Sequence, residues 1–488
     1  MSVTITAQAP DNVFTKRLKI TKYSDGRRKV QLSSNILAMI GFEKGTKVVE
    51  QNLGWGFGYM VHLSEQMPLI RNVKRIYSRE YKTKRNNPFE LTFETTSKAI
   101  LNSIPDDCDY VHVTLSQGKM RFLPLINKVG LRLKNMMQSK DPFSIFSACT
   151  SGIDAHAAAS EGFTVDHILE YRPNEKRDKN RDLSETGALS VLANLDVKNV
   201  FNEDIEKVDV DILDAYYRIN PSSLFTISLQ CCEFSSLKSK KSREMSFDEG
   251  TSTLDMAYDG LRIIDKLQPP AILMEQVEGF VGSDIFKMWD LRLRKWGYRT
   301  FYKVIDARDH GGLSPRKRLF HFATTLPVSF DFPEEMQRNV EPIWNHHIDK
   351  YLGEPRATVE RGKKHLYLGE LRDVTHSESI RKGDECGRLR VVDQSSIHFP
   401  ALTKSQRRMA KDSLYIKYKD RYLMPSLELE AEIMGLPLDF NLSINNQDTT
   451  SEILGQAVDW PVYKSIIQKV KQHFSNFLFG VNLKSSIA

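Results

Sequence analysis

The sequence predicts an α/β fold, with a mostly parallel sheet covered by helices, for residues 141–326. Short β-rich runs alternate with helical stretches through this region, which is typical of such a sheet. Each expected strand gives way abruptly to a loop of polar or small residues, and the four strands are expected at 143–148, 165–169, 224–229 and 271–274. Ligands bind beyond the carboxyl ends of the strands in open α/β sheets, so functional residues are expected in these loops.

The flanking segments differ from this central region in composition. The 488 residues allow about two to four domains, and the hydrophobic fraction of 40% is sufficient for buried cores. A helix expected at 427–434 ends at a stop signal, Gly435 followed by Pro437. The expected divisions are a small β-rich domain (1–65), a basic α/β extension (66–140), the central domain (141–326), a polar irregular region (327–420) and a C-terminal part that returns to the central domain (421–488).

Composition narrows the classes of function and partner. Lys and Arg number 69 against 62 Asp and Glu, so the net charge of +7 permits an anionic partner without establishing one. Five cysteines without C-x-x-C spacing predict a reducing, cytoplasmic compartment and no metal site. The first residues lack the pattern of a signal peptide and no apolar run approaches 18 residues, so we expect neither export nor a membrane span.

The loop after the first expected strand has the composition of a cofactor site. Small residues from 146 to 154 let backbone N–H groups and a helix N-terminus approach a polar ligand closely. The next strand ends at Glu170, where a carboxylate binds the vicinal hydroxyls of a ribose, and Asp204 follows a further β-like segment. Each signal alone is weak and compatible with plain packing, but their order along one α/β unit favours a nucleoside-bearing cofactor.

Three further loops carry groups that predict covalent chemistry. Cys231 follows the third strand, in a position where a thiol with a lowered pKa acts as a nucleophile, although a lone cysteine is more often a buried apolar residue. Glu275 ends the fourth strand, and Arg316 and Arg318 follow a glycine turn. A thiol, a carboxylate and two guanidinium groups would therefore converge on one edge of the sheet.

In this series of motifs the sequence resembles the DNA (cytosine-5) methyltransferase family. Residues 231–235 resemble its P-C-Q-x-F-S loop, 275–277 its E-N-V segment, 311–318 its G-V-P-Q-x-R-x-R segment and 455–458 its late G-N-[SA]-V segment. The resemblance implies a Rossmann-like class I S-adenosyl-L-methionine-dependent methyltransferase fold with a small target-recognition domain at 327–420 and an extra β-rich N-terminal domain. It implies contacts to S-adenosylmethionine from Phe146, Ser147, Ala148, Gly152, Ile153, Glu170, Asp204, Ile205, Gln456 and Val458.

The same resemblance implies a mechanism and a partner. The Cys231 thiolate would add to carbon 6 of a flipped-out cytosine, and carbon 5 would then take the methyl group. Glu275 would hydrogen-bond the ring, Arg318 would hold its carbonyl oxygen and Arg316 would support the loop. We expect a monomer acting on double-stranded DNA, with backbone contacts from Ser235, Lys238, Lys240, Lys241 and Arg243.

Several residues depart from the family pattern: Gln230, Cys232, Gln276, Ser314 and Gln456 stand where the family has proline, glutamine, asparagine, glutamine and asparagine. Spacing alone selects Cys231 over Cys232 as the nucleophile. Two alternatives therefore stay open, namely a methyltransferase acting on cytosine in RNA, and a protein that binds DNA and cofactor with impaired catalysis.

The amino-terminal segment has a weaker resemblance. Residues 18–50 are similar to the AbrB-like swapped-hairpin DNA-binding module, with a strand, a short helix, a glycine turn and a strand, but a plain small β-domain fits equally well. Basic residues then alternate with tyrosines across 71–85, a composition that suits contact with phosphates and stacking on bases.

Overall fold

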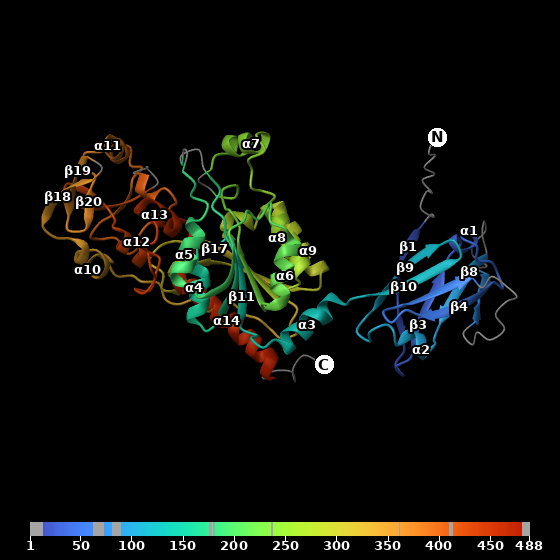
Figure 1. Cartoon of the computed structure of the whole chain (residues 1–488). Coiled ribbons are helices and arrows are strands. Elements are labelled where there is room, and N and C mark those ends of the chain that lie inside the picture. Colours follow the sequence, from blue (N-terminus) through green and yellow to red (C-terminus); the bar gives the residue numbers. More distant parts are fainter. Residues whose placement is uncertain are drawn as a thin grey trace, which may run out of the picture. The chain divides into compact units, whose positions relative to one another are not determined.

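The computed structural model describes residues 13–61, 73–80, 89–174, 178, 181–235, 238–360, 362–408 and 413–480. The chain divides into two units, residues 1–131 and 132–488 (Figure 1). Neither unit has, among the residues described, a helix long and apolar enough to cross a membrane.

The first unit consists of two antiparallel sheets with a shared core. Alternation of apolar and polar residues in β9 and β10 directs Val111, Val113 and Phe122 inward, where Phe122 stacks on Phe57 with ring centroids 4.7 Å apart. Within the described residues, the larger sheet has the order β1 (Phe14–Lys19), β9 (Tyr110–Ser116), β10 (Lys119–Leu125), β5 (Phe57–Val61), β4 (Lys47–Asn52), β6 (Val73–Arg75), and the smaller β2 (Thr21–Lys22), β3 (Arg28–Ser33), β8 (Phe89–Thr95), β7 (Tyr77–Glu80).

Strands from the segments 1–65 and 66–140 interleave in this unit. β1 pairs with β9, β3 with β8 and β4 with both β5 and β6, so the two segments build the same sheets. Short helices α1 (Ile36–Met39) and α2 (Lys98–Leu101) complete the unit. The order of strand, short helix, turn and strand expected over 18–50 is present as β3, α1 and β4, and the turn contains Gly41 and Gly45 with φ of +85° and +91°.

The second unit contains the predicted parallel sheet. The four predicted strands are confirmed as β11, β12, β14 and β15, all of which are buried on both faces, which explains their continuous apolar runs. As far as the structure describes the unit, the order is β13 (Val197–Phe201), β12 (Thr164–Leu169), β11 (Ser144–Ala148), β14 (Leu224–Ser228), β15 (Ala271–Val277), β17 (Lys317–Thr324), β16 (Arg299–Asp306), of which only β17 is antiparallel to its neighbours. This order confirms the Rossmann-like α/β fold.

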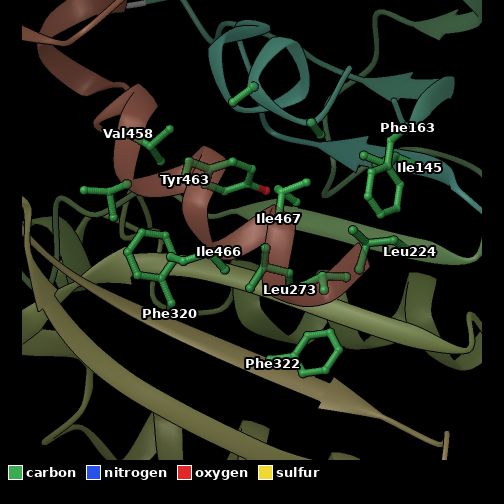
Figure 2. Close-up of a cluster of buried hydrophobic side chains, with 14 of the residues drawn as sticks. Ile145, Phe163, Leu224, Leu273, Phe320, Phe322, Val458, Tyr463, Ile466 and Ile467 are labelled. Atoms are coloured by element: carbon green, nitrogen blue, oxygen red, sulfur yellow. The ribbon is translucent and has the colours of Figure 1, made fainter. Parts of the chain in front are cut away.

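Helices bury both faces of this sheet. On one face, α4 (Ile153–Ser160) and α14 (Trp460–Phe479) pack on a core that includes Leu224, Phe320 and Ile467, as Figure 2 shows. On the other face lie α6 (Val210–Ile219), α8 (Met256–Leu267) and α9 (Asp284–Lys295). The remaining helices of this part are α3 (Lys128–Gln138), α5 (Thr186–Asn194), α7 (Lys240–Asp248), η2 (Glu278–Phe280) and η3 (Ala307–His310).

The region expected to be polar and irregular forms a sheet of its own instead. Its strands are short and broken by glycine turns, which hides the period of two from the sequence, yet Leu371, Leu414 and Leu423 are fully buried in a separate core. In the described residues the order is β18 (Pro355–Glu360), β19 (Lys363–Leu368), β20 (Leu371–Asp373), β23 (Arg421–Met424), β22 (Leu414–Tyr418), β21 (Arg390–Val392), with α10 (Trp344–His347), η4 (Asp349–Tyr351), α11 (Glu378–Glu385) and η5 (Gln406–Arg408) around it.

The chain then returns to the central sheet. The predicted helix at 427–434 is confirmed as α12 (Leu427–Ile433), and α13 (Gln447–Gln456) follows it. Asp459 caps α14 by accepting a hydrogen bond from the Val462 N–H at 3.2 Å, and Pro461 stands in its first turn. The last helix of the chain thereby completes the core of a sheet that begins more than 300 residues earlier.

The packing of α14 gives a stability prediction. Ile467→Ala should lower the free energy of unfolding by about 2–5 kcal/mol, because it leaves a cavity between α14 and the sheet. Gln468→Ala, at the neighbouring exposed position, should change it by less than about 0.5 kcal/mol. Urea unfolding followed by tryptophan fluorescence measures both, and equal stability of the two variants would contradict this packing.

Candidate active site

A pocket of about 340 Å³ opens where the strand order reverses, between β11 and β14. This is the position at which open α/β sheets bind their ligands. The pocket is lined by the loops that follow β11, β12, β13 and β14, by the last residues of β15, and by residues 456–458 at the end of α13. Its volume lies in the range of small-molecule sites, about 300–1,000 Å³.

The loop between β11 and α4 lies against the pocket through its first three residues. Cys149, Thr150 and Ser151 line the pocket, and Cys149 adopts a left-handed conformation with φ of +57°. Gly152 has φ of +99°, and an added Cβ there would lie 3.3 Å from Val191. The buried Asp154 stabilises the turn because its carboxylate accepts hydrogen bonds from the Thr150 hydroxyl and the Ala155 N–H.

Four of the predicted cofactor contacts in this loop lie beside the pocket rather than in its wall. Phe146 and Ala148 point into the core under α6 and α8, and Ser147 is buried with its hydroxyl 3.5 Å from Asp154. Gly152 shapes the backbone but does not line the cavity. Ile153, Glu170, Asp204, Ile205, Gln456 and Val458 do line it.

Glu170 is an almost fully buried carboxylate in the pocket wall. Burial, reinforced by the nearby Asp154, raises its pKa to about 8, although the Thr150 N–H donates a hydrogen bond to it. Room for the side chain depends on Gly187, where a Cβ would overlap the carboxylate. In the absence of a ligand, Glu170 is therefore mostly protonated at neutral pH.

Cys231 and Cys232 have different environments after β14. Cys231 is half-buried and lines the pocket, whereas Cys232 is exposed and does not line it. Burial raises the pKa of the Cys231 thiol, Cys232 adds to the increase, and the Arg318 guanidinium acts in the opposite direction. The resting thiol is therefore protonated, and its activation requires removal of a proton.

Gln276 fixes the start of the nucleophile loop. Its side-chain Nε2 donates a hydrogen bond to the Leu229 carbonyl at 3.0 Å, and its Oε1 accepts one from the Val277 N–H at 2.8 Å. The residue is buried, so both bonds are shielded from water. The glutamine that replaces the family asparagine is thus a positioning residue, because it holds the backbone at Leu229, two positions before Cys231.

Glu275 and Arg318 form an ion pair in the pocket wall beside Cys231. The Arg318 Nε lies 2.9 Å from the Glu275 Oε1, and both residues line the cavity. Burial raises the pKa of Glu275, and the charges of Arg318 and Arg316 only partly offset this effect. The carboxyl group is therefore easier to protonate than an exposed glutamate, which is the property required of a hydrogen-bond donor to a ring nitrogen.

Arg316 is fully buried, and its guanidinium bonds to backbone carbonyls. Its guanidinium donates to the carbonyls of Leu402 (3.2 Å), Gly455 (3.1 Å) and Ala457. Burial lowers its pKa to about 9, so it stays charged at neutral pH. Arg316 therefore ties the start of β17 to the segment 456–458, which lines the pocket.

The basic residues predicted to contact DNA divide into two groups around α7. Lys238 donates hydrogen bonds to Glu233 (2.6 Å) and Ser246 (2.8 Å), and Arg243 donates to the Ser235 carbonyl (2.5 Å). These bonds attach α7, which buries none of its residues, to the nucleophile loop. Lys240 and Lys241 are exposed, and Lys240 lies only loosely, at 3.9 Å, from Glu244.

Several pocket residues have no recognisable signal in the sequence. Glu452 lies 3.4 Å from Arg172 and 3.3 Å from Lys404, so a carboxylate from α13 joins the wall to the loop after β12. Glu203, Glu206 and Asp154 add further acids, and this acidic lining suits a ligand that carries positive charge. The described part of the chain contains no group of three or more residues able to hold a metal ion.

Comparison with known proteins places the chain in a family. The model of the C-5 cytosine-specific DNA methylase family matches residues 192–472, which is 281 of the 488 residues. The chain is 25% identical over 227 residues to the type II methyltransferase M.BsuFI of Bacillus subtilis, covering 45% of this chain and 51% of that one. It is 24% identical over 246 residues to M.FnuDI of Fusobacterium nucleatum, covering 44% and 68%.

A solved structure of similar fold is the S. pombe Dnmt2 methyltransferase, with a TM-score of 0.48, 16% identity and coverage of 70% of this chain and 99% of that one. The second unit combines a Rossmann-like sheet, a pocket at the switch point of that sheet, a cysteine and a Glu–Arg pair. The chain belongs to the C-5 cytosine-specific DNA methylase family. It spans about half the length of the Bacillus relative, and the family match begins after Glu170.

The buried contacts of Arg316 give a second prediction. Arg316→Met should lower the free energy of unfolding by about 3 kcal/mol or more, because three backbone carbonyls lose a charged donor. Arg316→Lys should recover part of this loss. Lys317→Gln, at the exposed neighbour, should stay within about 0.5 kcal/mol of the unchanged protein in urea unfolding. Equal midpoints for Arg316→Met and the unchanged protein would contradict the positioning role.

Proposed function

We propose that the chain transfers a methyl group from S-adenosylmethionine to carbon 5 of cytosine in double-stranded DNA. The observation that carries this proposal is the meeting of Cys231, Glu275 and Arg318 in one wall of the pocket at the switch point. Membership in the C-5 cytosine-specific DNA methylase family supports the reaction type. The arrangement also supplies the three functions that the chemistry needs, namely a nucleophile, a hydrogen-bond donor and a cation.

The pocket residues fit S-adenosylmethionine. Glu170 and Asp204 follow adjacent strands, where carboxylates accept hydrogen bonds from ribose and base. The acidic lining complements a positively charged sulfonium. When bound, this cofactor supplies an electrophilic methyl group.

Cys231 activates the target ring by covalent addition. Carbon 5 of cytosine is a poor nucleophile, and a bond from the Cys231 sulfur to carbon 6 makes it electron-rich. Burial raises the pKa of Glu275, and its protonated form donates a hydrogen bond at ring nitrogen N3, which stabilises the charge that develops there. Arg318 holds the ring carbonyl oxygen. After carbon 5 has taken the methyl group, loss of the carbon 5 proton to water breaks the bond from sulfur to carbon 6 and releases Cys231 as a thiolate.

The cytosine must leave the duplex to reach this pocket, which costs a few kcal/mol. Contacts to the DNA backbone offset that cost, and the exposed Lys240 and Lys241 on α7 are available for them. Lys238 and Arg243 contribute by holding α7 against the nucleophile loop. The sheet formed by β18 to β23 is the proposed reader of the target sequence.

The choice of nucleophile gives the test of this function. Cys231→Ser should reduce transfer of labelled methyl to duplex DNA by at least about 10³-fold, because the hydroxyl is a far weaker nucleophile than the thiolate. The matched variant Cys232→Ser should keep transfer within about threefold, since Cys232 does not line the pocket. The reverse result would make Cys232 the nucleophile.

The same assay on duplex DNA and transfer RNA decides the substrate. Transfer to RNA alone would replace the DNA substrate. Binding of DNA and S-adenosylmethionine with no modified cytosine in either substrate would show that catalysis has been lost.

Cofactor binding should depend on pH through Glu170. Ribose hydroxyls donate hydrogen bonds to the ionised carboxylate. Binding at a pH below the Glu170 pKa of about 8 therefore releases a proton from Glu170. The Kd of S-adenosylmethionine should therefore fall by up to about tenfold per pH unit from pH 6 and level off above about 8. Glu170→Gln should bind more weakly and lose this slope in calorimetry, and an unchanged slope would assign the proton to another group.

A further inference from the structure

The outer face of the larger sheet in the first unit has a consistent composition. Burial alternates along β9, where Val111, Val113 and Leu115 point into the core, so His112 and Thr114 point outward. Residues directly opposite one another in an antiparallel pair share a face, so the register identifies the outward residues of every neighbouring strand.

The register gathers basic side chains on this outer face. In β1, Arg17 pairs with His112, and in β10, Arg121 pairs with Thr114. Lys47 of β4 lies directly opposite Arg75 of β6. The complete outward set is Arg17, Lys19, Lys47, Arg75, Lys119 and Arg121, contributed by β1, β4, β6 and β10, and all six are exposed.

No carboxylate balances these charges among the described residues of the sheet. The one acid in its described strands, Glu50, points to the other side, where it is buried and lies 3.1 Å from Lys74. None of the six basic residues has an ion-pair partner within the described ranges. The smaller sheet differs, because Lys29 there lies 3.8 Å from Glu94.

This arrangement costs folding energy unless an anion neutralises it. Like charges directly opposite each other in an antiparallel pair, as in Lys47 and Arg75, repel. The six charges spread over five strand spacings, about 24 Å, which is too wide for one small anion. A polymer with regularly repeated charge matches this width, and duplex DNA carries one charge per about 1.7 Å of its axis.

We propose that this outer face, the basic sheet face, docks the backbone of duplex DNA independently of the methyltransferase pocket. Neutral outward residues such as Thr15, Thr114 and Gln51 supply additional hydrogen bonds to phosphate oxygens. Tyr110, the aromatic residue on the face, already has the Arg17 guanidinium 3.8 Å from its ring centroid. The face therefore offers little stacking surface for unpaired bases, which favours a duplex over a single strand.

The face differs from the basic run expected at 71–85. That run divides between two sides of the sheet, since Lys74 points toward Glu50 and Arg75 points outward. Arg71, Lys82, Lys84 and Arg85 lie outside the described residues. The surface is assembled instead by register from strands more than 100 residues apart in sequence.

Salt-dependent binding of the full chain tests this proposal. The face variant Arg17→Gln/Lys47→Gln/Arg121→Gln is compared with the control variant Lys16→Gln/Arg27→Gln/Lys98→Gln, which removes the same charge from exposed positions off the face. The probe is a labelled A·T duplex, which contains no cytosine, in fluorescence anisotropy without cofactor. The face variant should bind about tenfold or more weakly, and its slope of log K against log salt should be shallower by about 2 to 3.

The control variant should keep its affinity for the duplex within about twofold, because its three substitutions leave the basic sheet face unchanged. Equal weakening of the two variants would reduce the effect to net charge and overturn the proposal, as would unchanged binding of the face variant. Selective loss of binding to single-stranded RNA, or to phosphatidylserine vesicles, with duplex binding intact would assign the face to that partner instead. Because methyl transfer is not measured, these outcomes are independent of the proposed catalytic function.

Discussion

The reversal of strand order between β11 and β14 is the constraint on which the site depends. Helices on both faces bury the strands, so backbone and side chains at the strand ends face a single opening. Four strand-end loops and the end of β15 meet there, and each loop brings at least two polar groups. Residues from 149 to 458 become neighbours only because the sheet turns back at this point.

Burial raises the pKa of carboxyl groups at both ends of the pocket. At one end, Glu170 and Asp154 are carboxyl groups with raised pKa values that a charged or hydroxylated ligand would ionise. At the other end, burial also raises the pKa values of Glu275 and Cys231, and the charge of Arg318 offsets part of both increases. A cluster of acids and a Glu–Arg ion pair thus line the same cavity.

One departure from the family pattern, Gln276, has a local explanation. Gln276 reaches the Leu229 carbonyl while its oxygen accepts from Val277, so the glutamine bridges β15 and the nucleophile loop. Gly455, which fits the family pattern, leaves room for the Thr403 carbonyl, and its own carbonyl accepts a hydrogen bond from Arg316. Nothing in the structure explains the serine at position 314, whose hydroxyl has no hydrogen-bond partner in the described residues.

The sequence by itself determined the parallel strands, the place of Cys231 after one strand and of Glu275 near the end of the next, and the helix at 427–434, because apolar runs and stop signals are local properties. Tertiary structure alone decided which residues of the first loop face the cavity, since Phe146 turns into the core while Thr150 lines the pocket. It also decided the sheet formed by β18 to β23, the partners of Arg316 and the basic sheet face. These features arise from register and from contacts across hundreds of residues, and no local pattern encodes such pairings.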